Sequence, residues 1–207
     1  MKYTESKYAN DDAGQSESQK DWSDYYEATK QGPPRPLLVS ALKHVTNKNR
    51  AIDIGSGALN DTRYLLGQGF DVVSIDKNPT MEQEAVDKQN EKLHTFMTKF
   101  EDFNFPENEY DLASAMYSLP FIDPIHFNYV LAKIKSSLKK GGIFCGQFFG
   151  VHDEWSTNQK MTFHTKDQLK VMFEDFSIIS FEEEEIDKET ATGKMKHWHV
   201  FHVIARK

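Results

Sequence analysis

Cysteine is almost absent from the sequence, since Cys145 is the only one among 207 residues. A single thiol excludes an intramolecular disulfide and a zinc site built from cysteines. The N-terminal part has no apolar run that could serve as a signal peptide or membrane span, so we expect a cytoplasmic protein with no membrane partner. Because Cys145 lies in an apolar stretch, we expect a buried core thiol rather than a nucleophile.

The sequence also has fewer basic than acidic residues. The chain has 25 Lys and Arg residues against 32 Asp and Glu residues, for a formal net charge of -7, and the basic residues are scattered. Binding to duplex nucleic acid depends mainly on neutralising phosphates with Lys and Arg, so we expect no nucleic-acid partner. A small molecule is the expected partner, and the protein is expected to be a monomer or a homodimer.

The sequence does contain enough apolar material for one core. Hydrophobic residues make up 38% of the chain, with 15 Phe among them, and 207 residues suit a single domain. Residues 1–20 hold almost no aliphatic side chains, so they are predicted to form a mobile N-terminal tail. Residues 21–207 are predicted to form one domain, without internal repeats.

The domain is expected to open with two helices and to continue with alternating strands and helices. The first helix should begin with Asp21 as its cap, and the second should follow the turn at residues 32–36. Later helices are expected over residues 79–90, from Asp123 to the segment 139–142, and near residues 165–173. The predicted strands are Ala51–Ile54, Phe70–Ile75, Leu93–Met97, Tyr110–Met116, Ile143–Phe149 and a final pair, Ser177–Glu185 and Lys194–Ala205. This order predicts an α/β fold, a doubly wound and mostly parallel sheet with an antiparallel C-terminal hairpin.

The residues that carry chemistry gather in the loop after the first predicted strand. Gly55 and Gly57 follow the strand directly and precede a helix, where glycine lets the backbone turn tightly and approach a ligand. Asp76 closes the next strand, and the fold should bring it to the same crevice, where a carboxylate can accept hydrogen bonds from ribose hydroxyls. The loop therefore predicts a nucleotide-type ligand.

Two other residues indicate what charge this ligand carries. A dinucleotide loop has a third glycine and a helix N-terminus open to pyrophosphate, whereas this loop has Leu59 and, in the first turn of the helix, Asp61. Negative charge there would repel pyrophosphate, and Asp53 adds a further carboxylate before the first glycine. The sequence therefore favours a cationic cofactor.

At these residues the sequence resembles the class I S-adenosylmethionine-dependent methyltransferases, whose first motif is an acidic residue, any residue, Gly, any residue, Gly. The resemblance extends from about residue 21 to the C-terminus. It includes the segments Glu101-Asp102-Phe103, Tyr110-Asp111-Leu112 and Lys139-Lys140-Gly141-Gly142. Within the class, the segments Tyr25-Tyr26, Gly32-Pro33-Pro34-Arg35 and Asn60-Asp61-Thr62 resemble the branch that includes the tellurite-resistance methyltransferases. The resemblance implies a Rossmann-like fold with N-terminal helices covering the site, and methyl transfer from S-adenosyl-L-methionine to a small-molecule acceptor.

The same resemblance implies which residues hold the cofactor. The implied contacts are Asp53, Gly55, Ser56 and Gly57 at the amino acid end, Asp76 at the ribose, Lys77, Asp102 and Phe103 at the adenine, and Met116 with Tyr117 closing the pocket. Leu59 departs from the third glycine that is commoner in the family. Plain structural interpretations remain open, with Asp76 as a local cap, Asp102 as a solvated charge and Tyr117 as a packed aromatic.

The catalytic residues stay unknown at this level. A sulfonium carries its own leaving group, so the protein mainly has to orient the acceptor and exclude water. An acceptor that loses a proton would need a base, whereas a thiolate or soft anion would need none. The candidates near the expected mouth of the crevice are Tyr25, Tyr117, His152 and His164, and Arg35 could attract an anionic acceptor or be an ordinary surface residue.

Three histidines near the C-terminus, His197, His199 and His202, suggest a metal site at first. In a strand the first two share one face and the third points to the other, so we expect no bound metal and a half-buried strand instead. A nicotinamide-dependent oxidoreductase and a non-catalytic cofactor-binding domain remain the alternative functions. Cofactor binding and turnover distinguish them.

Overall fold

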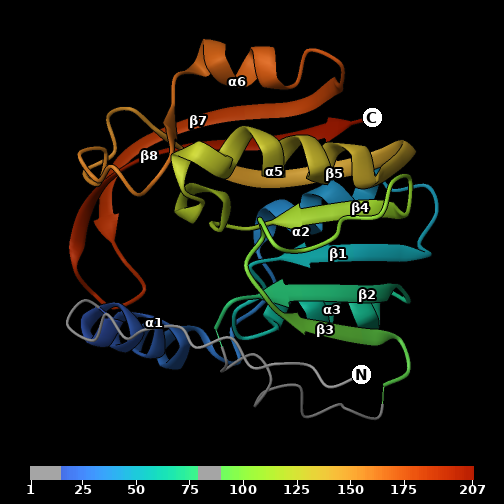
Figure 1. The fold of residues 1–207 in the computed structure, drawn as a ribbon, viewed down its shortest axis with the longest axis horizontal. Helices are drawn as coiled ribbons and strands as arrows, with labels where there is room; N and C mark the ends of the chain where they lie inside the picture. Colours follow the sequence, from blue (N-terminus) through green and yellow to red (C-terminus); the bar gives the residue numbers. More distant parts are fainter. Residues whose placement is uncertain (1–14, 79–89) are drawn as a thin grey trace, which may run out of the picture.

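The computed structural model describes residues 15–78 and 90–207, and in these residues one eight-stranded sheet forms the centre of the molecule (Figure 1). The strand order is β3-β2-β1-β4-β5-β8-β7, with β6 paired to β5. The strands are β1 (Arg50–Ile54), β2 (Asp71–Asp76), β3 (Leu93–Met97), β4 (Tyr110–Ala115), β5 (Leu138–Gly150), β6 (Phe163–His164), β7 (Ser177–Glu189) and β8 (Met195–Arg206). The pairs from β3 to β5 are parallel, and β8 runs antiparallel to both β5 and β7. The predicted fold is confirmed.

Helices cover both faces of this sheet, as a doubly wound fold requires. They are α1 (Gln15–Thr29), α2 (Pro36–Ala41), η1 (Leu42–His44), α3 (Asn60–Gly67), η2 (Leu119–Phe121), α5 (Pro124–Ser137) and α6 (Lys166–Met172). In Figure 1, α5 and α6 lie in front of the sheet and α2 and α3 lie behind it. The helix α1 lies beyond the carboxyl ends of the parallel strands, on the side towards which the far ends of β7 and β8 bend.

Two apolar layers hold the helices on the sheet. In front, Phe127, Val130 and Ile134 of α5 pack with Phe144 and Phe148 of β5. Behind, Leu38 and Ala41 of α2 pack with Ile143, Cys145 and Ile204. Successive side chains of a strand point to opposite faces, so β5 supplies both layers. Cys145 is completely buried, as its sequence surroundings predict.

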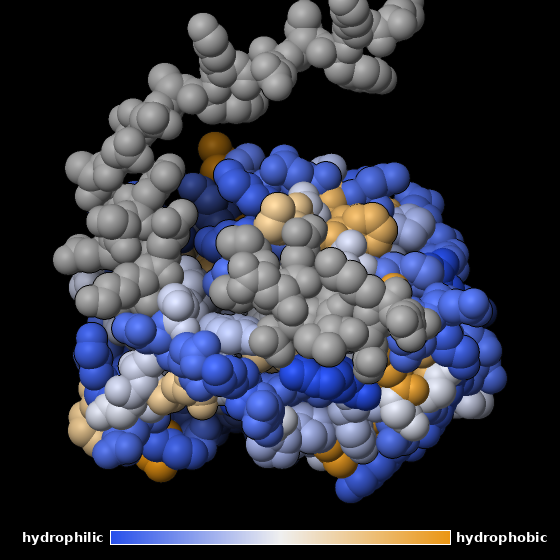
Figure 2. All heavy atoms as spheres, turned by 90° about the horizontal axis from the view of Figure 1, so that it is seen from below, coloured by the Kyte–Doolittle hydropathy of each residue, from blue (hydrophilic) through white to orange (hydrophobic). Residues whose placement is uncertain are grey.

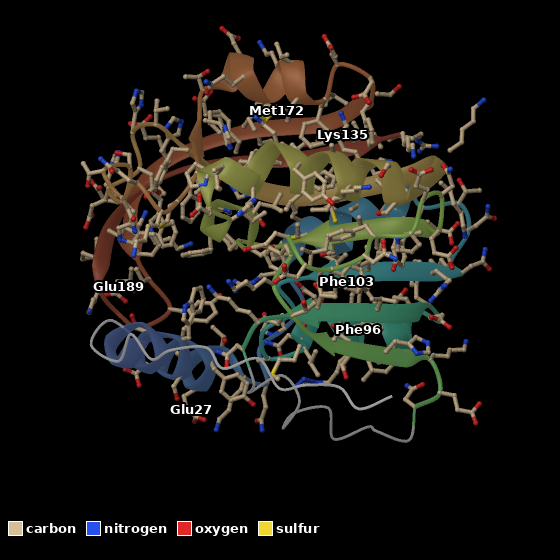
Figure 3. All side chains as sticks on the ribbon, viewed as in Figure 1. Glu27, Phe96, Phe103, Lys135, Met172 and Glu189 are labelled. Carbon is tan, nitrogen blue, oxygen red and sulfur yellow. The ribbon has the colours of Figure 1, made fainter. Side chains whose placement is uncertain are left out.

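Local signals set the ends of the helices. Asp123 accepts a hydrogen bond from the backbone N–H of Ile125, with Pro124 in the first turn of α5. Thr165 and Gln168 form a reciprocal capping box at the start of α6. A further link joins the two helices, because the Lys135 ammonium donates to the carbonyl of Met172; Figure 3 labels both residues.

The structure differs from the predicted elements in several places. The helix α1 begins at Gln15 rather than Asp21, so part of the predicted tail is helical. The strand β5 begins at Leu138, directly after α5, and the glycines expected to end the helix lie inside the strand. There Gly141 has φ +82°, and the pairing of β5 with β4 shifts in register. The short strand β6 was not predicted, and the expected helix over 79–90 falls almost wholly outside the described residues.

Where the described residues are visible in the view from below, hydrophobic groups form small clusters among hydrophilic ones (Figure 2). Two exposed apolar side chains, Phe96 and Met97, belong to the edge strand β3. Among the residues that the structure describes, no helix is both long and apolar enough to cross a membrane.

Candidate active site

The loop after β1 has the geometry of a ligand cradle. The N–H groups of Gly55 and Ser56 donate to the carbonyl of Ile75, and the N–H of Gly57 donates to the Asp76 carboxylate at 2.8 Å. Gly55 has φ +78°, and a Cβ there would stand 2.3 Å from the Cβ of Ser118. Gly57 has φ +47° and open space where a Cβ would be, so a ligand can approach its backbone closely. The loop joins the ends of β1 and β2, as its glycine spacing predicts.

Three carboxylates surround this loop. Asp53 is buried and accepts a hydrogen bond from the Thr62 hydroxyl at 2.6 Å. Asp61 accepts from the backbone N–H of Arg35 at 2.7 Å, and Asp76 lies at the end of β2. Burial, with the nearby charges of Asp61 and Asp76, raises the pKa of Asp53 to about 8. Burial also raises the pKa of Asp61. Carboxylates that resist ionisation for want of a counter-charge form a site suited to a cation.

The raised pKa of Asp53 predicts a pH dependence of stability. Between the ordinary carboxyl range and pH 8 the folded protein keeps this proton while the unfolded chain loses it, so stability falls as pH rises. His164, whose pKa burial lowers to about 4, acts in the opposite direction but only below its ordinary value of 6.5. We therefore expect the melting temperature of the ligand-free protein to decrease from pH 6.5 to pH 8. Asp53→Asn should flatten this slope in thermal denaturation, and equal slopes would contradict the assignment.

Leu59 explains how the loop works without a third glycine. Its backbone is left-handed, with φ 60° and ψ 21°, the conformation that glycine adopts without strain. Its side chain is 2% exposed. The burial of a leucine side chain therefore offsets the backbone strain at this position.

Leu59→Gly tests this balance. Relief of the left-handed strain should return about 1 kcal/mol, whereas loss of a buried leucine side chain costs about 3 kcal/mol. The net result should be a free energy of unfolding lower by roughly 2 kcal/mol in chemical denaturation. The control is Gln31→Gly, at an exposed residue with φ 63°, which loses no buried side chain and should be neutral or stabilising. A Leu59→Gly protein as stable as the wild type would contradict this account.

The residues expected at the adenine differ in their surroundings. Asp102 is exposed, and Phe103 packs against Phe96 and Phe105 with ring centroids 5.4 and 4.9 Å apart (Figure 3). Lys77 is exposed at the end of β2, and Met116 is packed in the layer beneath α2. Phe100 was not predicted, yet its ring lies 3.4 Å from the position of a Cβ on Gly55. No sequence motif marks Phe100, because only the folded loop brings it to the glycines.

The N-terminal segment supplies a cover for the expected acceptor side. The Arg35 guanidinium donates to the Tyr25 hydroxyl at 2.9 Å and lies 5.4 Å from the centre of the Tyr117 ring. Trp22 of α1 packs edge-on against Phe121 at 4.9 Å. The structure therefore brings together three of the predicted candidates, Tyr25, Arg35 and Tyr117. Tyr117 has φ 54°, an uncommon backbone conformation for an aromatic residue, which the surrounding contacts must hold.

The other two base candidates lie elsewhere. The expected place of His164 at the mouth of the crevice is wrong, because its ring is buried beside Phe127 and Phe148 at centroid distances of 4.5 and 6.2 Å. Pairing of β6 with β5 turns this side chain into the core. His152 is exposed and bonds the Glu185 carboxylate, while its ring stacks on His199.

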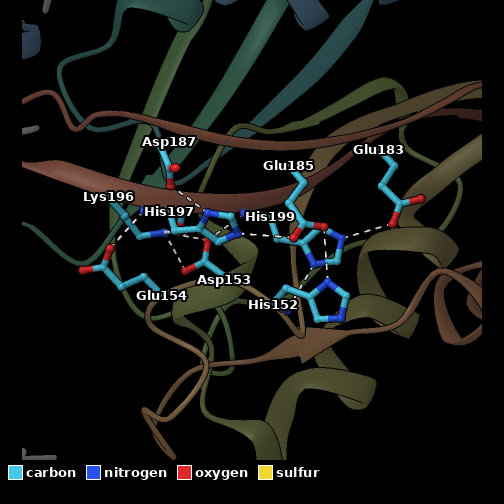
Figure 4. A network of polar contacts seen from close by, with 9 residues as sticks. All are labelled: His152, Asp153, Glu154, Glu183, Glu185, Asp187, Lys196, His197 and His199. Carbon is cyan, nitrogen blue, oxygen red and sulfur yellow. Dashed lines mark hydrogen bonds and ion pairs between the residues drawn. The ribbon is translucent and has the colours of Figure 1, made fainter.

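The histidines of β8 divide between the two faces of the strand. Figure 4 shows His197 and His199 in a polar network with carboxylates of β7. Ligand atoms of His152, Glu185 and His199 lie within 4.8 Å of one another. However, Nδ1 of His199 accepts a hydrogen bond from the backbone N–H of His152. The ring proton of His199 is therefore on Nε2, which donates to the Glu183 carboxylate. A metal on Nε2 would have to displace that proton, and hydrogen bonds already satisfy the ring. The absence of a bound metal stays a prediction.

The comparisons with known proteins fit this geometry. Residues 51–142 match the family model described as a methyltransferase domain. The matched segment runs from β1 to the start of β5 and includes the glycine loop and Asp76. Together with the Rossmann-like sheet, this match makes the chain similar to the class I, S-adenosylmethionine-dependent methyltransferases. A search of curated proteins found no match.

Solved structures share the fold at low identity. One is the 1,6-didemethyltoxoflavin-N1-methyltransferase of Burkholderia thailandensis, with 19% identity, a TM-score of 0.69, and coverage of 99% of this chain and 93% of that one. Another is TehB of Haemophilus influenzae, with 20% identity and a TM-score of 0.68 over 82% of this chain and 61% of that one. A third is a phosphoethanolamine N-methyltransferase of Haemonchus contortus, with 14% identity and a TM-score of 0.66 over 92% and 58%. At these identities the solved structures show a shared fold, and the family match agrees with the predicted resemblance to the class.

Proposed function

We propose that the crevice at the ends of β1, β2 and β4 binds S-adenosylmethionine for methyl transfer to a small, flat acceptor. The observation that carries the cofactor assignment is the set of carboxylates around an open glycine loop, Asp53, Asp61 and Asp76. When bound, the cofactor supplies an electrophilic methyl group and a cationic sulfonium. Such a cation next to Asp53 favours the ionised carboxylate that burial otherwise disfavours.

The geometry of the loop supports a set of residues that would hold the cofactor. The open backbone at Gly57 can receive the amino acid end, and the remaining lone pairs of Asp76 can accept from the ribose hydroxyls. Phe100 joins the predicted set as an apolar neighbour of the loop. The predicted contacts at Lys77, Asp102, Phe103, Met116 and Tyr117 remain part of the proposal, as do Asp53, Gly55 and Ser56.

The acceptor side is aromatic with one cation. Tyr117 packs against Phe149 and Trp198 at centroid distances of 6.4 and 6.2 Å, and the Arg35 guanidinium lies over the Tyr117 ring. Rings of this kind favour a flat acceptor, and Arg35 favours one with an anionic or oxygen-rich edge. In the toxoflavin-type neighbour the bound acceptor is 1,6-didemethyltoxoflavin. The net charge of -7 and the single buried Cys145 support a free small molecule in the cytoplasm as substrate.

Calorimetric titration tests the cofactor assignment. S-adenosylmethionine and S-adenosylhomocysteine should bind the wild-type protein with micromolar affinity, whereas NADH should not. Asp76→Ala removes both the ribose acceptor and the bond to Gly57, so affinity for both adenosyl ligands should fall at least about tenfold. The control is Asp167→Ala, a 91% exposed carboxylate on α6, which should bind as the wild type does. Binding of NADH alone, or of no ligand, would refute the proposal.

A further inference from the structure

A chain of polar contacts leads from Tyr117 across the sheet to β7. The Tyr117 backbone N–H donates to Oε1 of Gln147 at 3.2 Å, and Nε2 of Gln147 lies 3.5 Å from Nδ1 of His202. Nε2 of His202 lies 3.5 Å from a carboxylate oxygen of Glu184. From this geometry we infer that His202, oriented by Glu184, accepts the proton that the methyl acceptor loses. The inference rests on the proposed function and names the base that the sequence left open.

The contacts define the protonation of the imidazole. The amide of Gln147 receives a donor at its oxygen, so its nitrogen end faces His202 and Nδ1 of that ring must accept. The ring proton then lies on Nε2, towards Glu184, which is the carboxylate and imidazole arrangement of an oriented base. The contact from Gln147 is at the limit of hydrogen-bond length, so it is a weak hydrogen bond and the lone pair of Nδ1 stays available. This lone pair can take a proton.

The position of His202 also fits this role. Residues 198, 200 and 202 share one face of β8, and Trp198 packs on Tyr117. Gln147 is directly opposite His202 in the β5–β8 pairing and is 3% exposed. His197 and His199 point to the opposite face, where their carboxylate partners are different ones. The base is therefore on the side of the sheet where Arg35 and Tyr117 meet.

The proton transfer balances without any further reagent. The lone pair of the acceptor nitrogen or oxygen forms the bond to the methyl carbon, and the carbon–sulfur bond breaks with its electrons remaining on sulfur. The proton of the acceptor passes to Nδ1 of His202 and later to solvent. Among the described residues, the charged groups of β7 on the same face as His202 include Glu182 and Glu184. Beyond Gln147 lie three further titratable or charged groups, Tyr117, Tyr25 and Arg35. Glu184 stabilises the imidazolium that forms.

The test combines a structural and a kinetic measurement on the full chain. Nitrogen-15 NMR of the histidine rings should find the ring proton of His202 on Nε2. Glu184→Gln should reduce the share of this tautomer, because the carboxylate that favours a proton on Nε2 is removed. Finding the proton on Nδ1, or no effect of Glu184→Gln, would overturn the inference whatever the activity data show.

The kinetic test uses phenol and thiophenol as probe acceptors with S-adenosylmethionine. His202→Gln should slow methylation of the phenol at least about a hundredfold, the contribution typical of a positioned base. Methylation of thiophenol, which ionises without help at pH 8, should change less than about threefold. His197→Gln is the control on the opposite face and should leave both rates unchanged. Equal loss for both probes, or for neither, would contradict a proton-accepting role.

These measurements separate the two proposals. If the wild type binds no S-adenosylhomocysteine, the proposed function fails. If the wild type and His202→Gln bind S-adenosylhomocysteine equally well, a loss of methylation rate confined to the phenol assigns His202 as the base. If the wild type methylates neither probe, the ring measurement alone decides for or against the assigned protonation.

Discussion

Replacing Lys196 with methionine is expected to lower the free energy of unfolding by about 3–5 kcal/mol, because it removes one partner of a buried ion pair. The Lys196 ammonium bonds both carboxylate oxygens of Asp153 at 2.5 and 2.6 Å. The two side chains are 2% and 0% exposed. Removing the cation leaves a buried carboxylate without its partner, which costs much more than losing an exposed ion pair.

Aromatic rings enclose this ion pair. The ammonium lies 3.9 Å from the centre of a Trp198 ring, 4.4 Å from Trp155 and 5.2 Å from Phe149. Two of these rings also pack against Tyr117, so the pair supports the wall of the proposed acceptor site. Asp153 further accepts the backbone N–H groups of Trp155 and His199, which fix the loop after β5. Loss of Lys196 should therefore disturb both the loop and the aromatic wall.

A double-mutant cycle measures the pair itself. Asp153→Asn combined with Lys196→Met removes both charges, so the double variant should be more stable than the sum of the single losses predicts, by at least about 1 kcal/mol. The control is Lys166→Met, the same substitution in an exposed pair with Glu183, which should cost less than about 1 kcal/mol. Additive losses in the cycle would show that the ammonium and the carboxylate do not act as a buried pair.

Gly55→Ala is expected to weaken binding of S-adenosylhomocysteine by roughly a hundredfold, under the proposed function. The new methyl group would meet the Cβ of Ser118 at 2.3 Å, closer than atoms can pack. Ser118 cannot easily retreat, because its hydroxyl donates to the Ile54 carbonyl at 2.6 Å. A left-handed backbone adds a cost of about 1–2 kcal/mol for a residue with a side chain. The loop must shift, and the cradle shifts with it.

Gly193→Ala separates these two causes. Gly193 has φ +80°, almost the same as at Gly55, but nothing lies within 4 Å of the place of its Cβ. It carries the backbone cost alone, in the turn between β7 and β8, and its affinity for S-adenosylhomocysteine should equal that of the wild type. Calorimetry gives the affinities, and denaturation gives the stability of both variants. If Gly55→Ala binds as tightly as Gly193→Ala, the close contact with Ser118 has no part in ligand binding.

Local patterns were enough to predict the sheet and the glycine loop. Buried strands of five or six residues with helical segments between them define a parallel α/β fold, and strand ends place Asp53 and Asp76 together. The cap at Asp123 was visible because a cap depends on residues within one turn. The end of α5 was predicted too late, since Gly141 and Gly142 serve a register shift inside β5.

The candidate bases could not be chosen from the sequence. His164 was a candidate and His202 was not, yet the structure buries His164 against α5 and places His202 against Gln147 and Glu184. The difference comes from the pairing of β6 and β8 with β5, which decides the face that each side chain occupies. Phe100 escaped notice for a similar reason, since its contact with Gly55 joins residues 45 positions apart along the chain.

The sequence by itself determined the class of fold, the glycine loop and the acidic character of the cofactor crevice. These depend on residue order and on spacing within single strands, helices and turns. Only the tertiary structure decided that Tyr25, Arg35 and Tyr117 meet, that Lys196 neutralises Asp153, and that His202 rather than His164 contacts Gln147. Such contacts join distant segments, and their energies depend on burial and on the face of the sheet, which are set only when the whole chain has packed.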